Sequence, residues 1–84
     1  MAESAGVTIV FLGPLKDLAG TETLAVAGSL DWAGLLAAVG SQVAEQLQSE
    51  RVNVACNGTV LTDKAALQAS NGDEVALLPP VSGG

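Results

Sequence analysis

The spacing of the hydrophobic residues changes at Trp32, and this change constrains the fold more than any other feature of the chain. From Trp32 to Val43 apolar residues recur at spacings of three and four, which is typical of one apolar face of a helix. Elsewhere apolar residues alternate with polar ones or form short β-branched runs, as in strands. A single helix covers only one face of a sheet. The sequence therefore predicts an α+β domain with a sheet of about four or five strands.

Turn-forming residues divide the strand-like segments. Gly13-Pro14 ends the first segment, because proline has no N–H for a β-ladder. Asn57-Gly58 is typical of a two-residue hairpin. The segment Asp63–Ala69 is expected to form about one helical turn. The predicted strands are Val7–Leu12, Glu22–Ala27, Val52–Cys56, Thr59–Leu61 and Glu74–Leu78.

Capping residues bracket the predicted helix. Ser29 or Asp31 is placed to cap its start, since either side chain accepts a hydrogen bond from a free backbone N–H. Gly40 interrupts the helical pattern, and Ser41 is expected to cap a continuation through Leu47. With 84 residues the chain has room for one domain, which we place at residues 1–78, followed by a flexible tail at 79–84.

The charge of the chain excludes several classes of partner. Nine acidic residues against three basic ones give a formal net charge of −6. Such a chain repels phosphate backbones, so neither nucleic acid nor an anionic membrane is expected as a partner. The surface that a protein partner presents to it is expected to be basic.

The residue types that commonly carry catalysis are scarce. The chain has no histidine and one cysteine, Cys56, so it lacks a Ser–His or Cys–His pair, a zinc site and an internal disulfide. We expect no catalytic side chains, no metal and no bound cofactor. The acidic N-terminus does not resemble a signal peptide, and no apolar run approaches the ~20 residues of a membrane helix. These features favour a cytoplasmic protein.

The C-terminal tail is the strongest candidate for a functional site. Pro79-Pro80 follows an apolar strand and favours an extended, stiff backbone, and Gly83-Gly84 is slim enough to enter a narrow channel. A terminal carboxylate becomes an electrophile once its oxygen is a leaving group, for example after adenylation with ATP. The tail thus predicts activation of Gly84 in a partner's active site. The alternative is an ordinary loose terminus.

These residues resemble a known family. The segment Gly72–Gly84, together with Leu15–Gly20 and the hairpin at Asn57-Gly58-Thr59, is similar to the small subunit of molybdopterin synthase, the MoaD family. The resemblance implies a β-grasp, ubiquitin-like roll in which the first and last strands lie side by side. Members often carry aromatic residues before Pro-Pro, where this chain has Leu77-Leu78. The smaller apolar area is expected to weaken the partner interface or to alter the choice of partner.

The resemblance also implies a function. An E1-like adenylyltransferase, using ATP and Mg²⁺, activates Gly84, which becomes a thiocarboxylate. The tail then enters the large synthase subunit, in a heterotetramer, and donates sulfur to cyclic pyranopterin monophosphate. The inserted residues would be Pro79, Pro80, Val81, Ser82 and Gly83. Alternatives are a β-grasp sulfur carrier for thiamine, tungsten-cofactor or cysteine biosynthesis, a ubiquitin-like modifier, and an interaction module with an inert tail.

A docking surface is predicted beside the tail. Both faces of the first and last strands carry apolar residues, although one helix covers only one face. Either the Asp63–Ala69 segment folds over the second face, or that face docks a partner. The resemblance favours docking, with Leu12, Val60 and Leu78 at the interface. It also implies an ion pair between Lys16 and the adenylyltransferase. Cys56 is expected to be a small buried hydrophobe rather than a sulfur acceptor.

Overall fold

The predicted helix is present as two segments separated by Gly40. In the computed structural model, which describes residues 6–80, α2 covers Trp32–Val39 and α3 covers Ser41–Leu47. Asp31 is the cap of α2, and its carboxylate accepts a hydrogen bond of 2.8 Å from the Gly34 amide. Ser41 is not a cap as expected: it is the first residue of α3. The cap position belongs to Gly40, whose φ of 88° interrupts the helix.

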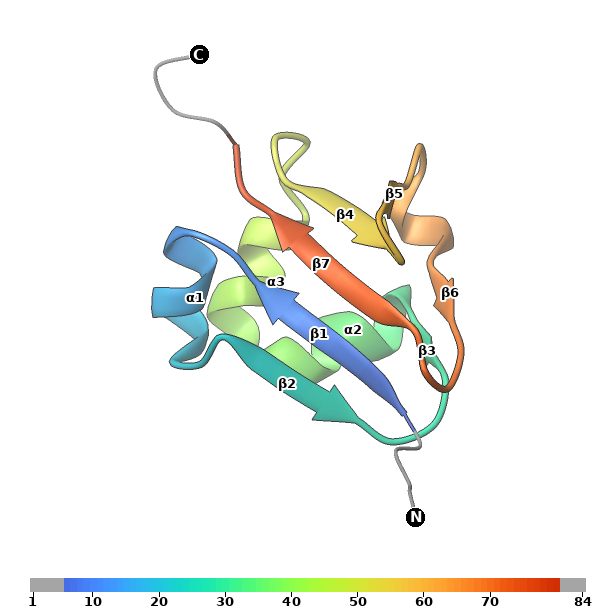
Figure 1. Ribbon diagram of the computed structural model, residues 1–84. Coiled ribbons are helices and arrows are strands. Elements are labelled where there is room, and N and C mark those ends of the chain that lie inside the picture. The colour runs from blue at the N-terminus through green and yellow to red at the C-terminus, as the bar shows by residue number, and fades with distance from the viewer. Residues whose placement is uncertain (1–5, 81–84) are drawn as a thin grey trace.

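All five predicted strands are present in one mixed sheet. Its order is β2-β1-β7-β4-β5, with β1 and β7 parallel and the other pairs antiparallel. Figure 1 shows the first and last strands side by side in the middle of the sheet, with α2 and α3 on one face. This arrangement confirms the β-grasp, ubiquitin-like prediction. The strands are β1 (Val7–Phe11), β2 (Thr23–Val26), β4 (Asn53–Cys56), β5 (Thr59–Val60) and β7 (Glu74–Leu78).

The core lies between this sheet and the two helices. Ile9, Val75 and Leu77 project from the central strands and are fully buried. Leu35 of α2 and Leu47 of α3 meet them from the helix side, also with no exposed surface. Burying each such side chain stabilises the fold by roughly 1.5–3 kcal/mol. The tail therefore begins at the end of a strand that is anchored at the centre of the molecule.

Three connections contain structure that the sequence pattern did not predict. A short helix, α1 (Pro14–Ala19), occupies the link between β1 and β2. Proline at its first position and the left-handed Gly20 at its end are the signals that could have identified it. The helical turn predicted in Asp63–Ala69 is present as a 3₁₀ helix, η1 (Lys64–Ala66), and strand β6 (Gln68–Ala69), which was not predicted, follows it. β6 pairs with β3 (Leu30–Asp31) in a separate two-stranded sheet.

Lys64 fastens η1 to the rest of the domain. Its ammonium donates hydrogen bonds to two backbone carbonyls in the link between α3 and β4, those of Ser49 and Val52, the latter at 2.6 Å. Burial lowers the pKa of Lys64 despite the nearby charge of Glu50.

Among the described residues, no helix is long and apolar enough to cross a membrane.

Candidate functional site: the tail root and the open face of the sheet

The central strand β7 leads into the tail, and its two faces lie in different surroundings. Leu77 has no exposed surface and points to the helices, whereas the next residue, Leu78, is half-buried and points the opposite way. Alternation along the strand thus gives Leu77 to the core and leaves Leu78, one of the predicted docking residues, on the opposite face. Leu78 is in register with Asn53 of β4, so it lies in the sheet and not in a loop.

An apolar row crosses the face of the sheet that is opposite the helices. The strand register aligns Val10, Ala76, Ala55 and Val60, from four adjacent strands, on this face. Leu12 continues the alternation one residue beyond β1. Val60 and Leu12 are 52% and 39% exposed, which is high for large aliphatic side chains. We call this surface the open face, and its apolar residues are Val10, Leu12, Ala55, Val60, Ala76 and Leu78.

Within residues 6–80 no helix covers the open face. The segment Asp63–Ala69, which was the alternative cover, is elsewhere: its strand β6 pairs with β3, and η1 lies close to α2. The three predicted docking residues, Leu12, Val60 and Leu78, are therefore brought to one side of the sheet. Whether a partner binds there remains a prediction.

The root of the tail touches the turn that follows β1. Pro79 is half-buried, and a Cβ built on Gly13 would lie 3.2 Å from its Cγ atom. Pro80 is exposed. The other residues predicted to act in the tail, Val81, Ser82, Gly83 and Gly84, lie outside the described residues.

Lys16 lies on α1 with an accessible ammonium group. Its Nζ atom is 3.8 Å from a carboxylate oxygen of Glu22, and both side chains are largely exposed. A surface pair at this distance is weak, worth about 0–1 kcal/mol. The ammonium is thus free to exchange Glu22 for a carboxylate of a partner.

A polar network that the sequence pattern did not reveal holds the other end of β7. The Asp73 carboxylate accepts hydrogen bonds from the Ser70 amide at 2.9 Å and from the Asn57 side chain at 3.0 Å. The side-chain oxygen Oδ1 of Asn57 in turn accepts a hydrogen bond from the Glu74 amide at 2.9 Å. These bonds, that of Ser70 first and that of Asn57 second, lower the pKa of Asp73.

Cys56 is half-buried on the helix side of β4, in register with Val75, and packs against the core. Burial raises the pKa of its thiol, and the nearby charge of Asp73 raises it further. A thiol with a raised pKa is a poor nucleophile at neutral pH because the thiolate is the reactive form. This environment agrees with the interpretation of Cys56 as a hydrophobic residue.

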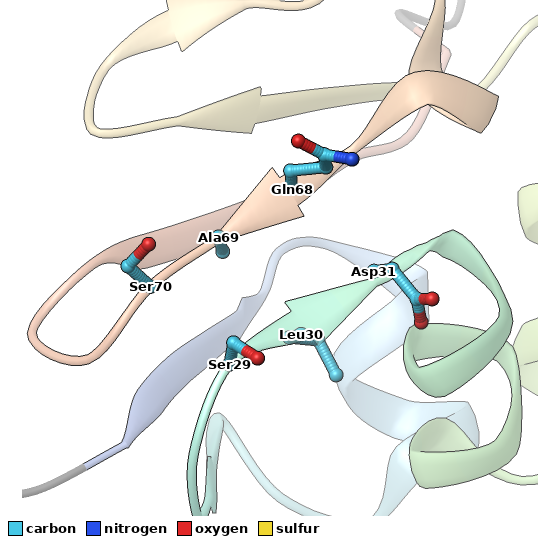
Figure 2. Close-up of a pocket in the computed structure, with 6 residues that line it drawn as sticks. All are labelled: Ser29, Leu30, Asp31, Gln68, Ala69 and Ser70. Carbon is cyan, nitrogen blue, oxygen red and sulfur yellow. The ribbon is translucent and has the colours of Figure 1, made fainter.

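The concave surfaces offer little chemistry of their own. Residues of the paired strands β3 and β6 and of their flanks line a pocket of about 450 Å³. In Figure 2 the Asp31 carboxylate turns toward the first turn of α2, which it caps. The remaining polar groups in this pocket are the side chains of Ser29, Gln68 and Ser70. Among residues 6–80 no cluster of three His, Cys, Asp or Glu side chains could hold a metal ion.

The fold matches solved structures of small archaeal proteins. The chain is 30% identical to SAMP1 from Haloferax volcanii, covering 95% of this chain and 100% of that one with a TM-score of 0.67. It is 27% identical to a second structure from that organism, small archaeal modifier protein 1, over 92% of this chain and 99% of that one, with a TM-score of 0.65. A search of curated protein sequences gave no match.

A third structure shares the fold at lower identity. A protein from Pyrococcus furiosus described as putative molybdopterin converting factor, subunit 1, is 22% identical over 93% of this chain and 100% of its own, with a TM-score of 0.66. The family model of ThiS matches residues 9–84, which include the central sheet, the open face and the whole tail. By this match, which spans nearly the entire sequence, the chain belongs to the ThiS family.

Proposed function

We propose that the chain is the sulfur-carrier subunit of molybdopterin synthase and that it works through a thiocarboxylate on Gly84. One observation carries the proposal: the central strand β7 ends at Leu78, so the tail begins at Pro79 directly beside the open face, which no helix within residues 6–80 covers. A partner that encloses the tail would also contact Leu78. The open face would then bind the partner, and the terminal Gly84 would carry the chemistry. Membership of the ThiS family supports the sulfur-carrier role.

The chemistry resides in the backbone terminus. The Gly84 carboxylate attacks the α-phosphorus of ATP, and pyrophosphate leaves to give an acyl adenylate. Hydrosulfide released by a sulfur donor then attacks the acyl carbon, displaces AMP and loses its proton, which leaves a thiocarboxylate. The thiocarboxylate transfers its sulfur to cyclic pyranopterin monophosphate in the large subunit, and hydrolysis restores the carboxylate. The adenylyltransferase supplies ATP and Mg²⁺, so this chain needs no side-chain catalyst.

Intact mass spectrometry tests the proposal. Incubation with the cognate adenylyltransferase, MgATP and a sulfur donor is expected to replace one oxygen by sulfur in the C-terminal peptide. Removal of Gly84 should abolish this shift and the synthesis of molybdopterin, while the thermal melt stays nearly unchanged, because a terminal residue makes few packed contacts. Sulfur found on Cys56, or synthesis restored by the truncated chain, would contradict the proposal.

The similarity to SAMP1 favours a second candidate, a ubiquitin-like modifier. In that role a lysine amine of a target protein attacks the activated Gly84 and forms an isopeptide bond. Conjugates of higher mass that disappear when Gly84 is removed would support this role. Recovery of a pterin-binding large subunit from cells would support the synthase, and recovery of a thiazole synthase would favour thiamine biosynthesis over both.

A further inference from the structure

The β-ladder cannot hold the tail beyond Leu78. Parallel pairing between β1 and β7 ends with Phe11 opposite Leu77. β7 then ends at Leu78, and the two prolines that follow have no N–H to donate. Since the ladder has no donor at these two positions, side-chain contacts at Pro79 contribute to the direction in which the tail starts.

Gly13 provides such a contact. Its backbone has φ 56° and ψ −136°, a combination that L-residues with a side chain rarely adopt. Hydrogen bonds at the start of α1 hold this turn: the Leu15 amide donates to the Leu12 carbonyl at 3.2 Å and the Lys16 amide to the Gly13 carbonyl at 3.0 Å. The half-buried Pro79 ring lies so close that a Cβ on Gly13 would be 3.2 Å from its Cγ.

From this geometry we propose that Gly13 is a positioning residue, which seats the Pro79 ring and so sets where the tail leaves the domain. The inference rests on the proposed function in one respect, namely that the tail must reach a partner's active site. A Cβ at this position would lie 3.2 Å from the ring, which is tighter than an ordinary contact, so the ring at the start of the tail would have to shift by a few tenths of an ångström. The open face, where the proposed function places partner binding, would remain unchanged except at its edge.

The contact itself is tested without any partner. In the NMR spectrum of the wild-type protein, we expect a nuclear Overhauser effect between the Gly13 α-protons and the Pro79 γ-protons, and its absence would overturn the proposal. Gly28→Ala is the matched control for Gly13→Ala, because Gly28 also has a positive φ, of 78°, but a Cβ added there would have no neighbouring atom within 4 Å. Pro79→Ala supplies a variant with an unaltered turn and no ring.

The positioning role is tested by the rate of acyl-adenylate formation with the adenylyltransferase. Misplacing a reacting group by ~1 Å costs up to ~10²-fold in rate, so we expect Gly13→Ala to lower kcat about tenfold with KM unchanged. Gly28→Ala should leave both constants near wild type. In the Pro79→Ala background Gly13→Ala should have a much smaller effect, since the ring it displaces is absent and only the strain of an L-residue at positive φ, which Gly28→Ala also introduces, remains.

Three results would overturn the inference. These are a Gly13→Ala defect confined to KM, equal losses of kcat in Gly13→Ala and Gly28→Ala, or multiplicative effects in the Gly13→Ala/Pro79→Ala double variant. If the wild-type chain forms no adenylate at all, the proposed function fails, and with it the role in catalysis. The nuclear Overhauser effect would still decide, separately, whether Gly13 seats the ring.

Discussion

The two faces of β7 differ in what surrounds them. Val75 and Leu77 are fully buried under the helices, whereas Ala76 and Leu78 face outward and remain partly exposed. All four residues are apolar, so hydrophobicity alone does not separate them. Their surroundings do, because alternation along a strand assigns successive residues to opposite sides. Apolar residues on the helix side hold the fold together, and we propose that those on the open face bind partners.

Leu77→Asp should give the largest effect, since it disrupts the packing between β7 and the helices. The variant places a carboxylate among fully buried aliphatic side chains with no partner, and unpaired buried charges are among the most costly substitutions. A domain of this size has a total stability of about 5–15 kcal/mol, so we expect unfolding or a severe loss of stability. Circular dichroism with thermal melting measures it. A melt close to wild type would show that the leucine is not part of the core.

Leu78→Asp makes the same chemical change on the other side and is the matched control. We expect the fold to survive, because the side chain is only half-buried. Binding to the large subunit should weaken at least about tenfold, which corresponds to ~1.4 kcal/mol, since a leucine buried in a contact contributes roughly 1.5–3 kcal/mol. Titration calorimetry measures the affinity. If Leu78→Asp melts while Leu77→Asp only weakens binding, the faces are reversed.

The sequence predicted the parts of this comparison that depend on local pattern. Apolar residues on both sides of the last strand predicted that one face, with Leu78, would lie away from the helix. The helical spacing from Trp32 to Val43 predicted the helical layer that covers the other face of the sheet. The pairing of β1 with β7 came from the family resemblance instead, because residues far apart in the sequence leave no periodic signal of their contact. The roles of the tail residues Val81–Gly84 in partner insertion and sulfur transfer remain predictions from the sequence.

Elements with few residues were harder to predict. Helix α1 has six residues, which is too short for its apolar spacing to repeat, and β3 and β6 have two residues each. Asn57 donates a hydrogen bond to Asp73 and accepts one from the Glu74 amide, over separations of 16 and 17 residues. The turn chemistry of Asn57-Gly58 predicted the local hairpin and not these distant partners. The contact between Gly13 and Pro79 likewise depends on how β1 and β7 pair.

Acid should weaken the polar end of β7 before it affects the apolar end. The pKa of Asp73 is lowered in the folded protein from its ordinary value of 3.8, so its ionised form contributes stability above that value. This contribution is lost as the pH falls through the lowered pKa. Urea unfolding at neutral pH and at about pH 2, below the ordinary aspartate pKa, measures it.

Asp73→Asn should remove part of this pH dependence. The variant should be less stable than wild type at neutral pH and closer to it in acid, because both proteins then lack the carboxylate. Glu45→Gln, an exposed change on α3, is the control and should leave the acid-induced loss intact. An undiminished loss in Asp73→Asn would mean that other carboxylates govern acid unfolding.

Lys16→Gln should give the smallest effect, because it alters the rim rather than either face of the sheet. Its ion pair with Glu22 is long and exposed, so thermal stability should change little. If Lys16 pairs with a carboxylate of the adenylyltransferase, the association rate should fall a few-fold at low salt, and the difference should disappear at high salt because exposed charges are screened. Arg51→Gln removes another exposed positive charge and should leave the rate unchanged if the effect is local. Equal losses in both variants would instead reflect the overall charge of the chain, and no loss in either would remove Lys16 from the docking surface.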